Sequence, residues 1–75
     1  MNKVAISNCI RELRFRAGEM TQQTLADRVG ITRQTVIAFE RGKYYPSLEL
    51  AFLIAQTFDV RLEDVFQHQQ ADSAS

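Results

Sequence analysis

The sequence predicts a small all-α domain, and three observations lead to this expectation. Thr21 and Thr32, both residue types that cap helix N-termini, stand eleven positions apart before helix-compatible stretches. Gly30 falls between these stretches, at a point where a helix end takes positive φ. Pro46-Ser47 then precedes a further apolar helical stretch. Seventy-five residues, 45% of them apolar, suffice for one modest core, so a single domain is expected.

The first helix is expected to run from about Asn8 or Cys9 to Ala17, with Gly18 closing it. Its inward positions follow helical spacing and are Ile10, Leu13 and Ala17. Two short helices follow, at residues 22–29 and 33–41. Ala26 is small enough to let these two helices approach closely at a steep angle. The pattern indicates a helix-turn-helix; the alternative is an ordinary helical hairpin that binds nothing.

The chain after Pro46 predicts two further helices. The longer one begins at the cap Ser47 and extends to Phe58, and Asp59 follows where the left-handed region is favoured. Its inward stripe consists of Ala51, Ile54, Ala55 and Phe58. A brief helix spans about residues 62–66. The polar stretch from Gln69 to Ser75 is expected to be a disordered tail, which leaves residues 1–68 as the domain.

Arg33 conflicts with its local environment. It occupies the first helical position after Thr32, where the helix dipole disfavours a cation by roughly 0.3–1 kcal/mol. A residue that opposes its surroundings is more often present for function. An exposed guanidinium there suits a bidentate contact with guanine, and the neighbouring Gln34 suits adenine or a phosphate. The alternative for Arg33 is a solvated surface charge.

At these residues the chain resembles the lambda-repressor-like helix-turn-helix domains, the XRE family, over about residues 9–66. The matching positions are Gln22, Ala26, Gly30, the run from Thr32 to Val36, the run from Phe39 to Gly42, and the run from Pro46 to Leu48. The resemblance implies a DNA-binding domain of five short helices whose third lies in the major groove. It also implies a largely buried ion pair between Arg14 and Glu40 that positions the reading helix. The alternative is two separate surface charges.

The ending from Leu62 to Gln67 resembles short cytolysin-repressor-type members of the family, which carry a small added sheet. The stretch from Lys3 to Ser7 alternates with period two, and the stretch from Val65 to Gln69 could pair with it in an antiparallel sheet. In one respect the chain departs from the family pattern, because Arg61 stands where a serine-type cap is favoured.

The expected DNA contacts divide into two groups. Base reading is assigned to Arg33, Gln34, Ile37 and Ala38, with Ile37 against a thymine methyl group. Ala38 replaces a longer polar residue of the family, so fewer direct hydrogen bonds are expected. Phosphate binding is assigned to Gln22, Thr32, Thr35, Arg41, Lys43, Tyr44 and Arg16.

The formal net charge of zero hides an uneven distribution. Residues 1–46 carry an excess of four positive charges, and residues 47–75 carry an equal excess of negative charges. The expected reading helices lie in the basic half, and the acidic half would face away from DNA phosphates.

A homodimer is expected, because domains of this kind gain affinity by binding two half-sites one helical turn apart. The candidate dimer surface comprises Leu50, Phe52, Leu53, Val60 and Leu62. The alternative is that these residues extend the contact of their helix with the core.

Other functions find little support. The residues contain no catalytic triad, phosphate loop or metal cluster, and the lone Cys9 and His68 make neither a disulfide nor a metal site. We therefore expect no enzymatic activity, no cofactor and no small-molecule ligand. No leader or membrane span is evident, which predicts a cytoplasmic protein. The expected function is a dimeric repressor that binds operator DNA; the alternative is an antitoxin or another protein-interaction module with secondary DNA binding.

Overall fold

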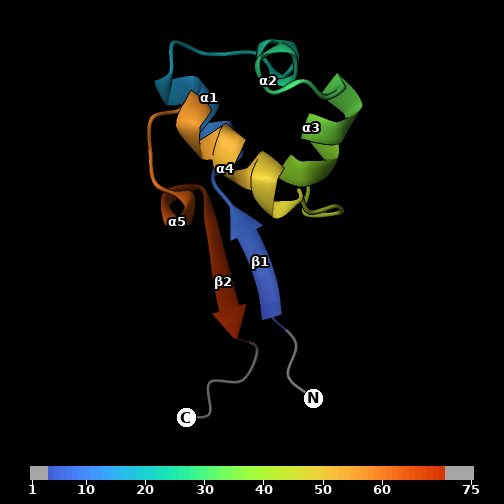
Figure 1. The fold of residues 1–75 in the computed structure, drawn as a ribbon, viewed down its shortest axis with the longest axis vertical. Helices are drawn as coiled ribbons and strands as arrows, with labels where there is room; N and C mark the ends of the chain where they lie inside the picture. Colours follow the sequence, from blue (N-terminus) through green and yellow to red (C-terminus); the bar gives the residue numbers. More distant parts are fainter. Residues whose placement is uncertain (1–3, 71–75) are drawn as a thin grey trace.

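The computed structural model describes residues 4–70 as five short helices and a two-stranded sheet (Figure 1). In chain order the elements are β1 (Val4–Asn8), α1 (Ile10–Arg16), α2 (Gln22–Val29), α3 (Arg33–Glu40), α4 (Leu48–Thr57), α5 (Leu62–Val65) and β2 (Phe66–Gln70). Figure 1 shows the helices gathered into one body from which β1 and β2 extend as a ribbon. The predicted five-helix fold and its terminal sheet are confirmed.

The ribbon is antiparallel, with Val4 opposite Gln70 and Asn8 opposite Phe66. Asn8 joins its base to the helices. The Asn8 Nδ2 group donates to the Phe39 carbonyl at 2.8 Å, and Asn8 Oδ1 accepts from the Ile10 backbone N–H at 3.2 Å. One amide therefore ties β1 to the start of α1 and to the last turn of α3.

The pairing extends β2 to Gln70. Gln69 and Gln70, expected to begin a disordered tail, lie in β2 because their backbone pairs with β1. Lys3, expected to begin the first strand, and the rest of the expected tail, residues 71–75, lie outside the described residues.

The end of α1 differs from the prediction. Ala17 was expected to face the core but is exposed, because α1 stops at Arg16 and Ala17 is already its C-cap. Gly18 and Glu19 then take positive φ, 79° and 58°, and turn the chain back. Met20, only 8% exposed, fills the core beside this turn.

The expected caps form at three helices. Thr21, Thr32 and Ser47 each accept a backbone N–H three residues ahead, at the starts of α2, α3 and α4. Gly30 takes φ 78° and donates its N–H to the Ala26 carbonyl, which ends α2. Ala26 is completely buried, in keeping with close packing between α2 and α3.

The core joins all the helices. Its largest fully buried side chains are Phe39, Ile10, Leu25, Ile54, Val36 and Val65. From α4, Ala51, Ile54 and Ala55 are buried as predicted, and Phe58 packs against the cluster. Asp59 takes the left-handed conformation that its position predicted, with φ 57°.

The short helix α5 begins at Arg61, whose side chain makes no cap. Instead, the Asp64 carboxylate accepts from the Arg61 backbone N–H at 3.0 Å. A hydrogen bond from its own backbone N–H and the neighbouring Arg61 guanidinium lower the pKa of Glu63.

Across residues 4–70, no helix combines the length and apolarity needed to cross a bilayer.

Candidate nucleic-acid interface

The helix α3 presents one face to the core and another to solvent. Val36 and Phe39 are each 1% exposed and belong to the core. The four predicted base readers lie elsewhere on the helix: Arg33 and Gln34 are exposed, and Ile37 and Ala38 are half-buried. The predicted division of α3 into a packing face and a free face therefore exists in the structure.

Two threonines fix the N-terminal end of α3. Thr32 Oγ1 accepts from the Thr35 backbone N–H at 3.2 Å, and the two hydroxyl oxygens lie 2.8 Å apart. These hydroxyls were expected to bind phosphate. In the structure they hydrogen-bond each other, which holds the first turn that carries Arg33.

The far end of α3 is tied to α1 and α2 through Glu40. Arg14 Nε lies 2.7 Å from Glu40 Oε2, and Arg14 Nη2 donates to Glu40 Oε1 at 3.1 Å. Arg14 Nη1 also donates to the Met20 carbonyl at 2.8 Å. The two ionic side chains are 8% and 10% exposed. The contact is bidentate, and it joins α1 to the last turn of α3.

Gln22 has a partner that the sequence did not indicate. Its Nε2 atom donates to Glu40 Oε1 at 3.1 Å, so the side chain expected to bind phosphate is held by the ion pair. An amide nitrogen carries two N–H groups, so Gln22 Nε2 has a second donor besides the one that bonds Glu40. Glu40 of α3 thus contacts both α1 and the start of α2.

An open groove of about 930 Å³ lies beside α3. Arg33, Ile37, Glu40 and Arg41 line it from α3 and its C-cap, and α2 with its cap contributes Thr21, Gln22 and Gln23. The other side is formed by residues of α1, namely Arg11, Arg14 and Phe15. Side chains from three helices therefore surround a single groove.

The groove carries excess positive charge. Among the residues that the structure describes, the ion pairs are Arg14–Glu40 and Arg61–Glu63. Arg14 neutralises the acidic group of the groove, and Arg11, Arg33 and Arg41 belong to no ion pair in this part of the chain. Such a surface attracts anions.

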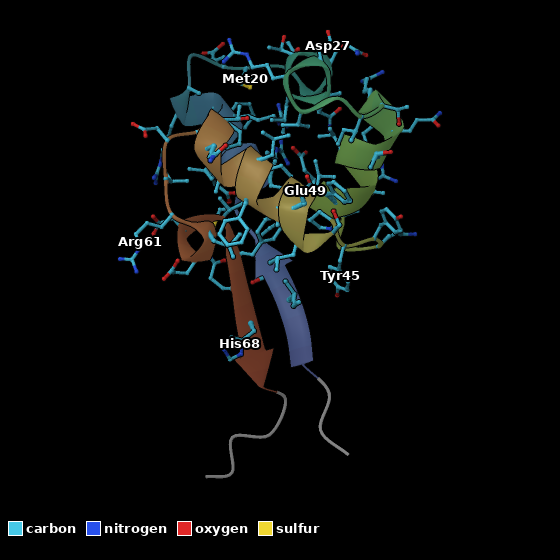
Figure 2. The ribbon with its side chains drawn as sticks, viewed as in Figure 1. Met20, Asp27, Tyr45, Glu49, Arg61 and His68 are labelled. Atoms are coloured by element: carbon cyan, nitrogen blue, oxygen red, sulfur yellow. The ribbon has the colours of Figure 1, made fainter. Side chains whose placement is uncertain are left out.

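Two acidic residues lie away from the groove. Figure 1 shows α3 and α5 on opposite sides of α4, and α5 carries Glu63 and Asp64. In Figure 2, Arg61 projects from the side of the molecule away from α3. The acidic residues of α5 therefore lie on a different side of the fold from α3.

The other predicted phosphate contacts are spread more widely. Arg41 lines the groove, and Lys43 and Tyr44 are exposed in the loop that follows α3. The Tyr44 ring stacks on Phe39, with centroids 5.7 Å apart and planes 9° from parallel. Arg16 is exposed at the end of α1 but does not line the groove.

Sequence reasoning missed Arg11 and Phe15. Both lie on α1, outside the helix-turn-helix, and neither interrupts the apolar pattern of that helix. Their separation of four residues places them on one side of α1, one turn apart. That spacing was the available signal, but by itself it did not indicate that this side borders α3.

The candidate dimer surface is only partly free. Leu50 and Val60 pack against the core, and Leu62 is half-buried. Phe52 and Leu53 remain 50% and 39% exposed. Leu48, which was not in the predicted set, is 68% exposed, more than any other large apolar residue whose burial the structure describes.

The five-helix arrangement, with a capped α3 beside a basic groove, defines the lambda-repressor-like class of helix-turn-helix proteins. A family model described as "Helix-turn-helix" matches residues 10–65. The chain therefore belongs to the XRE-type helix-turn-helix family of DNA-binding transcriptional regulators.

Relatives of similar size support this assignment. An uncharacterised HTH-type transcriptional regulator of Archaeoglobus fulgidus is 53% identical over 57 residues, covering 76% of this chain and 80% of the relative. The uncharacterised HTH-type regulator YgzD of Bacillus subtilis is 49% identical over 61 residues, covering 81% and 91% of the two chains.

Solved structures show the same fold. The restriction-modification controller protein C.AhdI of Aeromonas hydrophila superposes with a TM-score of 0.66 at 34% identity, covering 73% of this chain and 78% of that one. A Bacteroides fragilis protein assigned as DNA-binding superposes with a TM-score of 0.72 at 21% identity, covering 83% and 98%.

Proposed function

We propose that this protein recognises a specific operator as a homodimer and represses transcription by occluding a promoter. The observation that carries the proposal is the free face of α3. Arg33 and Gln34 are exposed in the first turn of α3, Arg33 has no ionic partner in the described chain, and the cap and the Glu40 contacts hold the helix at both ends. A rigid helix with free bidentate donors suits the major groove.

In this proposal the side chains of α3 read bases. Arg33 donates to guanine O6 and N7, Gln34 contacts adenine, and Ile37 and Ala38 supply apolar contacts. The half-buried state of Ile37 and Ala38 leaves part of each side chain for a thymine methyl group.

A second group of residues positions the protein on the DNA backbone without reading sequence. Gln22 and Arg41 bind phosphates from the groove, and Lys43 and Tyr44 bind them from the loop after α3. Thr32 and Thr35 act mainly through the first turn of α3, and Arg16 contacts DNA only at the edge of the interface.

The dimer is proposed to form through α4. Phe52 and Leu53 from the predicted surface, together with Leu48, are exposed apolar side chains that the core does not bury. A symmetric dimer would cover them and present two α3 helices to two half-sites. The similarity to a restriction-modification controller protein supports a regulatory role. Operator binding would require the protein to act in the cytoplasm, where a bacterial or archaeal genome lies.

Selection of bound duplexes from a random library tests the proposal. We expect an enriched motif with approximate two-fold symmetry and half-sites about 10–10.5 base pairs apart. Affinity for the enriched duplex should fall more steeply with salt concentration than it would for a neutral interface. Failure to enrich any sequence would overturn the specific-regulator proposal, even if non-specific binding persisted.

A further inference from the structure

The groove beside α3 has a wall that lies outside the helix-turn-helix. Arg11 and Phe15 of α1 form this wall, and Arg33, Ile37 and Arg41, from α3 and its C-cap, line the same groove. The predicted DNA contacts include none of the residues in the α1 wall. Its side chains nevertheless border the same space as Arg33.

Phe15 is held in this wall by two cations. Arg11 Cζ lies 5.5 Å from the centre of the Phe15 ring, and Arg14 Cζ lies 5.6 Å from it. The ring itself is 52% exposed. Cation–π contacts restrain the ring and the Arg11 guanidinium together. The wall therefore combines an apolar ring with cationic side chains that contact it.

The chemistry of the groove favours a polyanion with apolar segments. Arg11, Arg33 and Arg41 carry its unneutralised charge, while Phe15 and Ile37 supply apolar area. A DNA backbone alternates charged phosphates with deoxyribose rings that present C–H groups. Phosphate and sugar contacts of this type account for half or more of protein–DNA hydrogen bonds.

The position of the groove agrees with this ligand. A helix that enters the major groove, about 12 Å wide, has one sugar–phosphate backbone on each side of it. The groove of the protein runs beside α3, and residues at the N-terminus of α2 also line it. A duplex that receives α3 would bring one of these backbones close to the groove lined by Arg11 and Phe15.

We propose that the groove receives one sugar–phosphate backbone of the operator, with Arg11 bound to a phosphate and Phe15 packed against a deoxyribose. The proposal rests on the proposed DNA-binding function and adds α1 to the interface. The α1 contacts extend the footprint and carry no sequence information.

Arg11→Gln tests the phosphate contact, and Arg61→Gln is the matched control because Arg61 lies away from α3 (Figure 2). Affinity is measured at several salt concentrations for the enriched duplex and for a random duplex. Arg11→Gln should weaken binding to both by about tenfold, the size of one charge-assisted contact. It should also lower the magnitude of the salt slope by about 0.9. Arg61→Gln should leave affinity and slope close to wild type.

Phe15→Ala and Phe15→Leu test the sugar contact. Phe15→Ala should weaken binding to the enriched and the random duplex to a similar extent. Phe15→Leu should retain much of the wild-type affinity because leucine keeps apolar area at this position. Circular dichroism and urea unfolding establish that each variant is folded.

The outcomes separate this inference from the proposed function. If wild type enriches a motif and Arg11→Gln behaves like Arg61→Gln, α1 is not part of the interface and the inference is wrong. If Arg11→Gln changes the enriched bases, the phosphate assignment is overturned in favour of base reading. If wild type enriches no sequence, the proposed function itself fails.

Discussion

The Arg14 guanidinium meets the Glu40 carboxylate edge to edge, with Nε 2.7 Å from Oε2 and Nη2 3.1 Å from Oε1. The same carboxylate accepts from Gln22 Nε2. The Glu40 carboxylate thereby joins α1, α2 and α3, and α3 is the proposed reading helix. The pair lies at the C-terminal end of α3 and joins that end to α1.

Arg14→Met should destabilise the protein by about 3–5 kcal/mol, because it leaves the largely buried Glu40 without its cation. Urea unfolding followed by circular dichroism measures this change. The double variant Arg14→Met, Glu40→Met should recover most of the stability, since the unpaired charge is gone. DNA affinity should stay reduced in the double variant if the pair positions α3. Unchanged stability and affinity in Arg14→Met would show that the pair has neither role.

Asn8→Asp should lower the free energy of unfolding by roughly 1–3 kcal/mol. The change keeps the oxygen that accepts from Ile10 but replaces the group that donates to the Phe39 carbonyl with a second acceptor. Asn8→Ser, which retains a shorter donor and acceptor, should be less harmful. The measurement is chemical denaturation of both variants at neutral pH. Equal stability of Asn8→Asp and wild type would mean that the contact with α3 contributes nothing.

Gly30→Ala should lower the free energy of unfolding by about 1 kcal/mol. A Cβ at this position meets nothing within 4 Å, so the cost comes from the left-handed backbone, φ 78°, and not from crowding. Gly30→Asn should lose less, because asparagine tolerates this region. Thermal or urea unfolding compares the two. A larger loss for asparagine than for alanine would point to a steric cause.

Phe52→Glu should shift the protein from dimer to monomer. Phe52 is half exposed on α4, and a charge there would have to be buried in the proposed interface. Sedimentation equilibrium over a range of concentrations gives the association constant, and Phe52→Leu serves as the apolar control. The α4 surface is not the interface if wild type and Phe52→Glu associate equally.

Much of the fold could be predicted because local signals agree with it. The caps at Thr21, Thr32 and Ser47 and the turn at Gly30 depend on residues within one helical turn, and each formed where the sequence indicated. Ala17 was misplaced because its orientation depends on where α1 stops. That end is set by the paired left-handed residues Gly18 and Glu19, and only the glycine gave a signal.

The candidate site was only partly predictable for a related reason. Periodicity separated the free face of α3 from its packed face, which located Arg33 and Gln34. It could not show that Gln22 bonds Glu40, or that Arg11 and Phe15 border α3, because these relationships depend on how helices pack. Contacts between distant residues follow from tertiary structure and leave no local pattern.

Base reading by Arg33 from the first turn of α3 is tested by comparing Arg33→Ala with wild type on systematically substituted operators. Arg33→Ala should lose about 1–3 kcal/mol of binding free energy on the enriched duplex, together with discrimination at one symmetry-related position in each half-site. Discrimination at the other positions should persist. An equal loss of binding free energy on every duplex, with all base preferences retained, would contradict base reading by Arg33 and make it a phosphate contact.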